Sequence, residues 1–115
     1  MKTIVFSAIL SLILLSAPAV SGDAVKETSF TVSGLCNMCK NRIEKAMKIP
    51  EVKYAKWDKK SKQLKVAYLS ESISLDSLQQ RLAAVGHDTE KFKAADETYN
   101  GLPGCCLYRD GGNTH

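Results

Sequence analysis

The sequence predicts an α+β fold in which a four-stranded antiparallel sheet carries two helices on one face. Apolar and polar residues alternate over four short stretches, a pattern typical of half-buried strands. Over two other stretches the apolar residues recur at helical spacing, which is typical of amphipathic helices. These six segments occupy fewer than 70 of the 115 residues, in the order β-α-β-β-α-β. A chain of this length accommodates one domain of ordinary size.

The first strand and the first helix are separated by a short break. The strand is expected over residues 26–32, and Ser33-Gly34 interrupts its alternation. From Cys36 the period becomes helical until Pro50 ends the run, with the apolar positions Cys39, Ile43, Ala46 and Met47. A C-x-x-C motif therefore lies where a strand ends and a helix begins.

The remaining elements follow with short connections. Three further strands are expected, over residues 52–57, 64–69 and 89–92, and the polar turn 58–62 joins the first two of them. Ser74 is a suitable N-cap for the second helix, and Gly86 suits its C-terminal end. The apolar face of that helix comprises Leu75, Leu78, Leu82 and Val85.

This order of elements is the split β-α-β, ferredoxin-like arrangement. In that arrangement the first and third strands are antiparallel neighbours, and three loops meet at one end of the sheet. Here those loops are residues 33–39, 58–62 and 86–88. We therefore expect two thiols, three lysines and a histidine to share one end of the molecule.

The two ends of the chain differ from this compact unit. Lys2, a short apolar run and the small residues up to Ser21 are typical of a secretory signal peptide, expected over residues 1–21. The apolar run is too short to span a bilayer, so we predict an exported, periplasmic chain without a stable membrane anchor. The domain is expected over residues 22–93, and residues 94–115 form a C-terminal extension that contains Cys105 and Cys106.

The motif Cys36-Asn37-Met38-Cys39 carries the chemistry. Amide groups at a helix N-terminus stabilise thiolates, and this spacing lets both sulfurs hold one ion or form one disulfide. Thiolates without neighbouring carboxylates suit Cu(I) or Hg(II) better than Zn(II). A disulfide that staples an exported protein is the alternative. Met38, between the two cysteines, is expected to face solvent.

Residues 26–93 also resemble a known family. The matching stretches are Val32-Ser33-Gly34-Leu35-Cys36-Asn37-Met38-Cys39, Ile43-Glu44-Lys45-Ala46 and Leu82-Ala83-Ala84-Val85-Gly86-His87-Asp88. They resemble the heavy-metal-associated domains of copper chaperones, metal-pump N-terminal domains and periplasmic mercury-binding proteins. The resemblance implies one soft metal ion on Cys36 and Cys39, passed by ligand exchange and without enzymatic chemistry to a metal-transporting ATPase or another metal acceptor. It implies a monomer, with a metal-bridged dimer as the alternative.

The sequence departs from this family in its metal loop. Family members usually carry Gly-Met-x-Cys-x-x-Cys, whereas Gly34-Leu35-Cys36 is one residue shorter and lacks that methionine. Leu35 is the candidate for its packing role. His87 falls where the family places a Tyr, Lys or His, so it could donate to a thiolate, ligate the ion, or simply pack in the loop.

The adjacent cysteines of the extension have several candidate roles. The tail is expected to start at the far end of the sheet, but twelve extended residues reach roughly 40 Å, enough to return to the motif. Cys105 and Cys106 could then add thiolates to the metal site, close it by a disulfide to Cys36 or Cys39, or form a second site. A structural disulfide that ties down the tail is the simpler alternative.

The charge is unevenly distributed along the chain. Residues 40–65 carry a balance of +7 and residues 66–115 a balance of −3, within a net charge of +4. A basic face beside the metal loop would lower the pKa of the thiolates and attract an acidic partner. An ordinary solvated face is the alternative explanation.

Two other functions share features with this sequence. A thiol–disulfide oxidoreductase also places C-x-x-C at a strand-to-helix junction, and an RNA-recognition domain shares the order of elements. The first needs a longer chain, and the second needs an aromatic motif that is missing here, so no nucleic-acid partner is expected. We predict a non-enzymatic Cu(I) chaperone or scavenger, with Hg(II) or Zn(II) as alternative ions and a disulfide-stapled interaction module as the alternative class.

Overall fold

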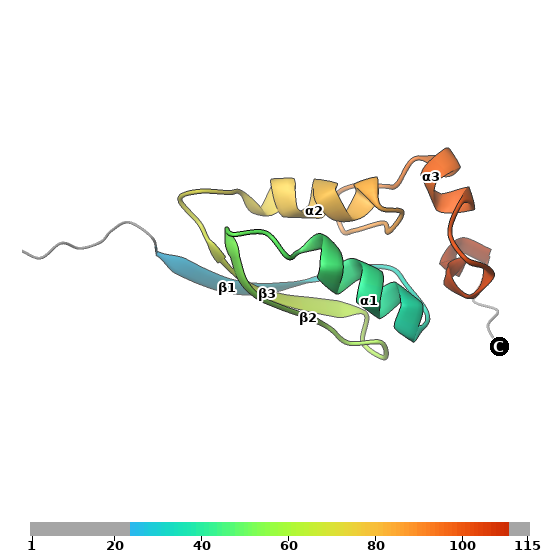
Figure 1. Cartoon of the computed structure of the whole chain (residues 1–115), viewed down its shortest axis with the longest axis horizontal. Helices are drawn as coiled ribbons and strands as arrows, with labels where there is room; N and C mark the ends of the chain where they lie inside the picture. Colours follow the sequence, from blue (N-terminus) through green and yellow to red (C-terminus); the bar gives the residue numbers. More distant parts are fainter. Residues whose placement is uncertain (1–23, 111–115) are drawn as a thin grey trace, which may run out of the picture.

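The computed structural model describes residues 24–110. Its sheet comprises β1 (Val25–Thr31), β2 (Val52–Trp57) and β3 (Gln63–Leu69), antiparallel throughout and in the order β1-β3-β2. Two helices, α1 (Asn37–Ala46) and α2 (Leu75–Ala84), lie on the same face of this sheet (Figure 1). The ferredoxin-like arrangement expected from the sequence is therefore confirmed. The predicted signal peptide, residues 1–21, lies outside the described residues.

The core lies between the sheet and the two helices. Phe30 and Trp57 both pair with Leu64, so the three side chains form one row across the sheet, and each is at most 1% exposed. Ile43 from α1 and Leu82 from α2 are fully buried above this row. Burying a side chain of this size contributes about 1.5–3 kcal/mol. Within residues 24–110, no helix has the length and hydropathy that a membrane-spanning segment requires.

Local sequence signals set the ends of both helices. Cys36 is the N-cap of α1 and Met47 its C-cap. At α2 the Ser74 hydroxyl accepts a hydrogen bond from the Ser77 N–H at 3.0 Å, as expected for an N-cap. Gly86 follows the C-cap with a φ of +107°, a conformation that glycine adopts without the steric cost of a Cβ.

The fourth predicted strand, residues 89–92, does not form as a strand. Within the described residues, the one backbone bridge to this segment links Thr89 to Val32, the residue after β1. The chain turns back on itself instead, because the Thr89 N–H donates to the Phe92 carbonyl at 2.8 Å and the Phe92 N–H donates to the Thr89 hydroxyl at 3.1 Å. The sheet therefore has three strands rather than four.

Side chains hold this turn in place. The Glu90 carboxylate accepts the Thr31 N–H of β1 at 3.0 Å, so a side chain satisfies a backbone donor next to the missing strand. The buried Gln79 of α2 accepts from the Thr89 hydroxyl at 2.8 Å and from the Lys91 N–H at 3.0 Å. A propensity pattern over four residues does not reveal these long-range partners.

The turn changes where the C-terminal extension begins. We expected it to start at the far end of the sheet, and this is wrong, because the Ala94 N–H donates to the Asp88 carboxylate at 2.8 Å. The extension continues through α3 (Asp96–Asn100) and two 3₁₀ turns, Gly104–Cys106 and Tyr108–Asp110. It lies at the end of the molecule where α1 begins (Figure 1).

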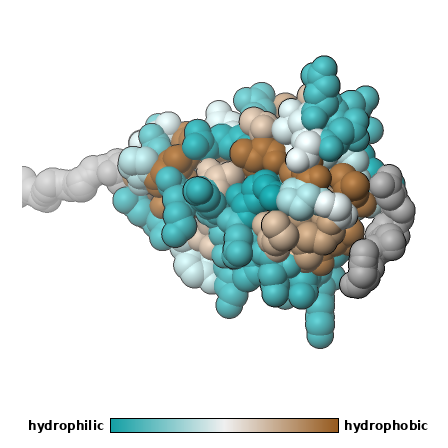
Figure 2. Space-filling model, turned by 45° about the vertical axis from the view of Figure 1, so that its right-hand side comes forward, coloured by the Kyte–Doolittle hydropathy of each residue, from teal (hydrophilic) through white to brown (hydrophobic). Residues whose placement is uncertain are grey.

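The three loops that were expected to meet do meet at this end. The Val32 N–H donates to the Lys62 carbonyl at 2.9 Å, which joins the end of β1 to the β2–β3 turn. The Ser33 N–H donates to the Asp88 carbonyl, also at 2.9 Å, which joins the metal-loop segment to the loop after α2. Apolar surface at this end of the molecule is framed by hydrophilic side chains (Figure 2).

Candidate metal centre

Four cysteine sulfurs converge at the loop between β1 and α1, although the two cysteine pairs lie about 70 residues apart in the sequence. The Cys36 sulfur lies 3.5 Å from that of Cys39, 2.8 Å from that of Cys105 and 3.4 Å from that of Cys106. The two tail sulfurs are 3.9 Å apart. All four cysteines are free thiols. The tail cysteines thus lie against the motif rather than forming a separate second cluster.

The four thiols differ in burial. Cys39 and Cys106 are fully buried, whereas Cys36 and Cys105 are partly exposed. The sulfurs of Cys36, Cys39 and Cys106 all lie within 4.8 Å of one another, which is close enough to hold one ion. Cys105 lies on the outer side and contacts the thioether of Met38 at 3.6 Å. Met38 is 50% exposed, as expected from the sequence.

The short loop before the motif packs directly on an aromatic ring. A Cβ on Gly34 would lie 3.0 Å from Trp57 Cη2 and 3.1 Å from Cys39 Cβ, so a larger residue would crowd both neighbours at this close approach. The Trp57 indole donates to the Val32 carbonyl at 3.0 Å. Leu35, which we expected to replace the missing methionine, is only half-buried, and the fully buried Trp57 fills the space under the loop.

The backbone of this loop also reaches the sulfurs. The Leu35 N–H donates to the Cys39 sulfur at 3.4 Å. Partial burial acts to raise the pKa of Cys36, but hydrogen bonds from the Cys105 thiol and the Cys39 N–H outweigh it and lower that pKa to about 7. Cys36 therefore ionises near neutral pH.

The two tail thiols keep their protons more strongly than an ordinary cysteine. Burial raises the pKa of Cys106, and the contact with Cys36 raises that of Cys105. The lowered pKa of Cys36 does not require the basic surface that we expected to cause it. Lys40, the lysine next to the motif, is engaged by the Glu44 carboxylate at 2.6 Å and the Trp57 carbonyl at 2.8 Å.

Arg42 is the cation in contact with the cluster. Its guanidinium donates to the Cys106 sulfur at 3.4 Å and lies 3.4 Å from His87 Nε2. His87 Nδ1–H donates to the Ser33 carbonyl at 2.8 Å, which leaves Nε2 as the acceptor for Arg42. Burial lowers the pKa of His87 to about 4, so the ring is neutral at pH 7.

His87 thus stands behind the sulfurs rather than among them. Both ring nitrogens have partners, and the ring stacks on Tyr108 with the centroids 5.7 Å apart. Of the three roles considered for it, this geometry matches packing combined with a hydrogen bond to Arg42. Sequence reasoning did not find Arg42, because its partners Cys106 and His87 lie 64 and 45 positions away in the chain.

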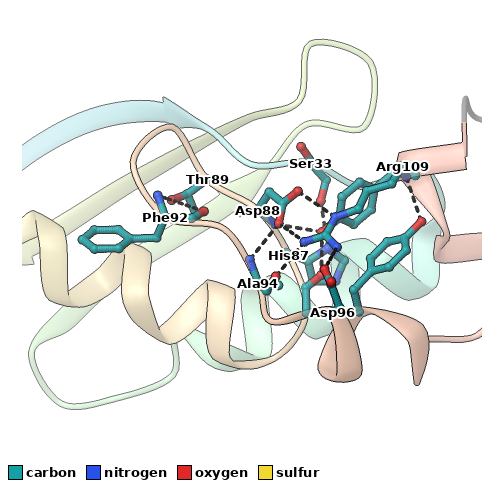
Figure 3. Close-up of polar contacts among 11 residues, drawn as sticks. Ser33, His87, Asp88, Thr89, Phe92, Ala94, Asp96 and Arg109 are labelled. Carbon is teal, nitrogen blue, oxygen red and sulfur yellow. Dashed lines mark hydrogen bonds and ion pairs between the residues drawn. The ribbon is translucent and has the colours of Figure 1, made fainter.

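An ion pair clasps the tail to the loop after α2. Arg109 makes two contacts with the Asp88 carboxylate, at 2.7 Å and 3.1 Å, and donates to the Ala94 carbonyl at 2.7 Å (Figure 3). The Tyr99 ring lies under the Arg109 guanidinium, 4.3 Å from its carbon. Partial burial opposes ionisation of Asp88, but the Arg109 guanidinium lowers the pKa of that carboxyl below its usual value.

Two further contacts seat the tail on Gly86. The Tyr108 hydroxyl donates to the Gly86 carbonyl at 2.6 Å and accepts the Asp88 N–H at 2.9 Å. A Cβ on Gly86 would lie 2.8 Å from a Leu102 methyl, so the glycine also makes room for the tail. Leu102 and Tyr108 therefore hold the tail against the loop after α2, together with Arg109, whose role was not anticipated.

The arrangement as a whole offers soft ligands in an enclosed position. Thiolates bind soft ions, and two of the three clustered thiols are shielded from water. Each thiol that binds an ion loses its proton to solvent, which favours ions with high thiolate affinity.

Several solved structures share this fold. The domain resembles the N-terminal domain of a potential copper-translocating P-type ATPase from Bacillus subtilis in the Cu(I)-loaded state, with 28% identity, a TM-score of 0.54 and coverage of 64% of this chain and 94% of that one. It resembles oxidized MerP from Ralstonia metallidurans CH34 with 22% identity, a TM-score of 0.55 and coverage of 58% and 96%. For the CopZ metallochaperone the values are 23%, 0.53, 56% and 98%.

A scan against protein-family models found no match, and a search of curated proteins found none either. These structures are covered almost completely, whereas 56–64% of this chain is matched.

Proposed function

Because the domain has a heavy-metal-associated-like fold, we propose that the protein binds one Cu(I) ion through the thiolates of Cys36 and Cys39. The observation that carries this proposal is the convergence of free cysteine sulfurs on the N-terminus of α1, with Cys36 and Cys39 3.5 Å apart. The Cu(I)-loaded P-type ATPase domain with the same fold supports the choice of ion. Hg(II) is the alternative ion, because it shares the preference for thiolates.

The site has the features of a carrier rather than of an enzyme. Within residues 24–110, the group of side chains close enough to hold an ion consists of three thiols. Cys36 is partly exposed and has a pKa of about 7, whereas Cys39 is buried, so Cys36 is the ligand through which an incoming or departing ion exchanges. The proposed partner is a metal-transporting ATPase or another metal-acceptor protein, and the proposed location is the periplasm, reached through the signal peptide.

A competition titration tests this function. The reduced protein is titrated anaerobically with Cu(I) in the presence of a chromophoric Cu(I) chelator, beside the variant Cys36→Ser/Cys39→Ser. We expect the wild-type protein to withdraw one equivalent of copper and the variant to lose at least about a hundredfold in affinity, or about 2.7 kcal/mol. Equal competition by both proteins would contradict the proposal. The same titration with Hg(II) ranks the two ions.

Thiol–disulfide exchange is a second candidate, favoured by one contact. The Cys36 sulfur has a pKa of about 7 and lies 2.8 Å from the Cys105 sulfur. A thiolate that close to a second thiol can form a disulfide when an external disulfide accepts the two electrons. Reduction of insulin by the dithiol protein would support this candidate, and we expect no activity above that of free dithiol.

A further inference from the structure

The tail cysteines sit in different positions although they are adjacent in sequence. Cys106 points inward, is fully buried, and contacts both the Cys36 sulfur and the Arg42 guanidinium, each at 3.4 Å. Cys105 points outward, contacts Met38, and lies at the open side of the cluster. Cys106 is therefore a candidate ligand for an ion held by the motif, whereas its neighbour Cys105 is not equally placed.

We propose that Cys106 supplies a third thiolate to the ion held by Cys36 and Cys39, so that the folded-back tail closes a three-sulfur Cu(I) site. This inference rests on the metal-binding function proposed above. It concerns residues 94–110, which follow the βαββα unit of this chain. Each of the three thiols gives up its proton to solvent when it ligates the ion.

The sulfur separations favour three ligands over two. With a metal–thiolate bond of about 2.3 Å, two sulfurs on opposite sides of an ion lie about 4.6 Å apart, and three around it in a plane lie about 4.0 Å apart. The Cys36 sulfur is 3.5 Å from Cys39 and 3.4 Å from Cys106, and all three pairs lie within 4.8 Å. A three-sulfur site therefore needs the two Cys36 separations to widen by about 0.5 and 0.6 Å, whereas a linear two-sulfur site needs the Cys36–Cys39 separation to widen by about 1.1 Å.

The charge around Cys106 suits an additional thiolate. Three thiolates on Cu(I) leave two excess negative charges, which are costly in a buried site unless a cation compensates them. The Arg42 guanidinium already donates to the Cys106 sulfur, and the neutral His87 ring accepts from Arg42 on its other side. His87 is therefore a positioning residue for the cation rather than a ligand.

Cys105 does not fit the same ion equally well. Its sulfur is 2.8 Å from that of Cys36, so joint ligation in a plane would require these two sulfurs to separate by about 1.2 Å. It is also outside the group of three sulfurs that all lie within 4.8 Å of one another. Cys105 thus provides a matched control for Cys106 at the adjacent position.

The clasp between Arg109 and Asp88 keeps Cys106 in place. Arg109 and Asp88 contact each other at 2.7 Å with side chains about one fifth exposed, and Arg109 follows Cys106 by three residues. The Tyr108 hydroxyl anchors the same segment to Gly86 at 2.6 Å. Before a partner can remove the ion, the Cys106 thiolate must dissociate from it. The tail would therefore slow the release of copper.

X-ray absorption at the copper edge counts the sulfurs directly. The protein is loaded with one equivalent of Cu(I), and wild type, Cys106→Ser and Cys105→Ser are compared. We expect three sulfurs in wild type and Cys105→Ser but two in Cys106→Ser. We also expect Cys106→Ser to release copper to a chelator at least about tenfold faster. Two sulfurs in wild type, or three in Cys106→Ser, would overturn the inference.

A second variant covers the case in which Cys106→Ser does not fold, as judged by Trp57 fluorescence. Arg109→Gln leaves all four sulfurs in the chain but removes the clasp, so we expect faster copper release than in wild type. Unchanged release from folded Arg109→Gln would then overturn the inference. The Cu(I) competition titration described above is done first, because it tests the proposed function separately. That function is refuted if the wild-type protein binds no copper, or if Cys36→Ser/Cys39→Ser binds copper as well as wild type.

Discussion

At the scale of single residues, Cys36 is the centre of the sulfur cluster. Its sulfur contacts the other three cysteine sulfurs at distances of 2.8 to 3.5 Å. Thiol hydrogen bonds stabilise its ionised form, which is why its pKa falls to about 7 despite partial burial. The reactivity of this thiol therefore reports on the integrity of the cluster.

Alkylation of the metal-free, reduced protein tests this assignment. We expect Cys36 to react first, with a rate that reaches half its maximum near pH 7, as followed by peptide mass spectrometry after timed quenching. In Cys105→Ala the closest donor is lost, so the midpoint should move toward the ordinary value for cysteine. An unchanged midpoint in this variant would refute the role of the Cys105 thiol.

His87 makes the stability of the metal-free protein depend on pH. The unfolded chain takes up a proton on this ring near its usual pKa of 6.5, whereas the folded chain does so only near 4. Stability therefore falls as the pH drops from 6.5 to 4, by roughly 3 kcal/mol, and this contribution levels off below pH 4. Urea unfolding followed by Trp57 fluorescence at several pH values measures it. In the variant His87→Gln, the free energy of unfolding should no longer show this dependence on pH between 6.5 and 4. The same dependence in both proteins would contradict the assignment to His87.

The sequence predicted the residues of the motif better than their surroundings. Cys36 and Cys39 could be chosen because spacing alone brings two side chains of one helix N-terminus together. Arg42 carried no signal, because a basic residue on a helix surface is ordinary until its partner is known. The same holds for Arg109, whose carboxylate partner Asp88 lies 21 positions away.

At the scale of the elements, the loop between β1 and α1 depends on a close contact with β2. Gly34 lies against the Trp57 ring at the end of β2. A Cβ on Gly34 would lie 3.0 Å from the ring atom Cη2, closer than an ordinary van der Waals contact. The elements themselves were predictable, since periodicity is local. The fourth strand was not, because Gln79 and Glu90 bind the turn at residues 89–92 across long sequence separations.

Replacing Gly34 tests the loop. We expect Gly34→Ala to destabilise the protein by about 1–3 kcal/mol through overpacking against Trp57, and to weaken copper binding by displacing Cys39. Gly104→Ala is the matched control, because a Cβ at that position meets no atom within 4 Å. Urea denaturation and copper competition measure the two effects. If the two variants had the same stability and the same copper affinity, the contact between Gly34 and Trp57 would not determine either property.

At the scale of the whole molecule, the C-terminal extension is part of the folded domain. The sequence indicated that the tail could reach the motif, but placed its start at the wrong end because it assumed a fourth strand. The turn at residues 89–92 shortens the path, and the Asp88–Arg109 pair ends it beside the loop after α2. Two segments about 70 residues apart thereby share one cluster of sulfurs.

Hydrogen exchange measures how firmly the tail is held. We expect Arg109→Gln to speed amide exchange in residues 96–109 at least about tenfold, or 1.4 kcal/mol, without changing β1 and β3. Lys91→Gln is the control, because the Lys91–Asp76 pair is exposed and surface pairs contribute little. Uniform acceleration throughout the domain in Arg109→Gln would instead indicate that the tail and the core unfold together.

Native mass spectrometry of the metal-loaded chain tests the central claim most directly. The reduced protein from residue 22 onward is titrated anaerobically with Cu(I), beside Cys36→Ser/Cys39→Ser. We expect one tightly held copper per wild-type chain, with a mass that shows the loss of thiol protons. We expect the variant to retain no copper. A wild-type chain that retains no copper, or a variant that retains as much, would contradict that claim.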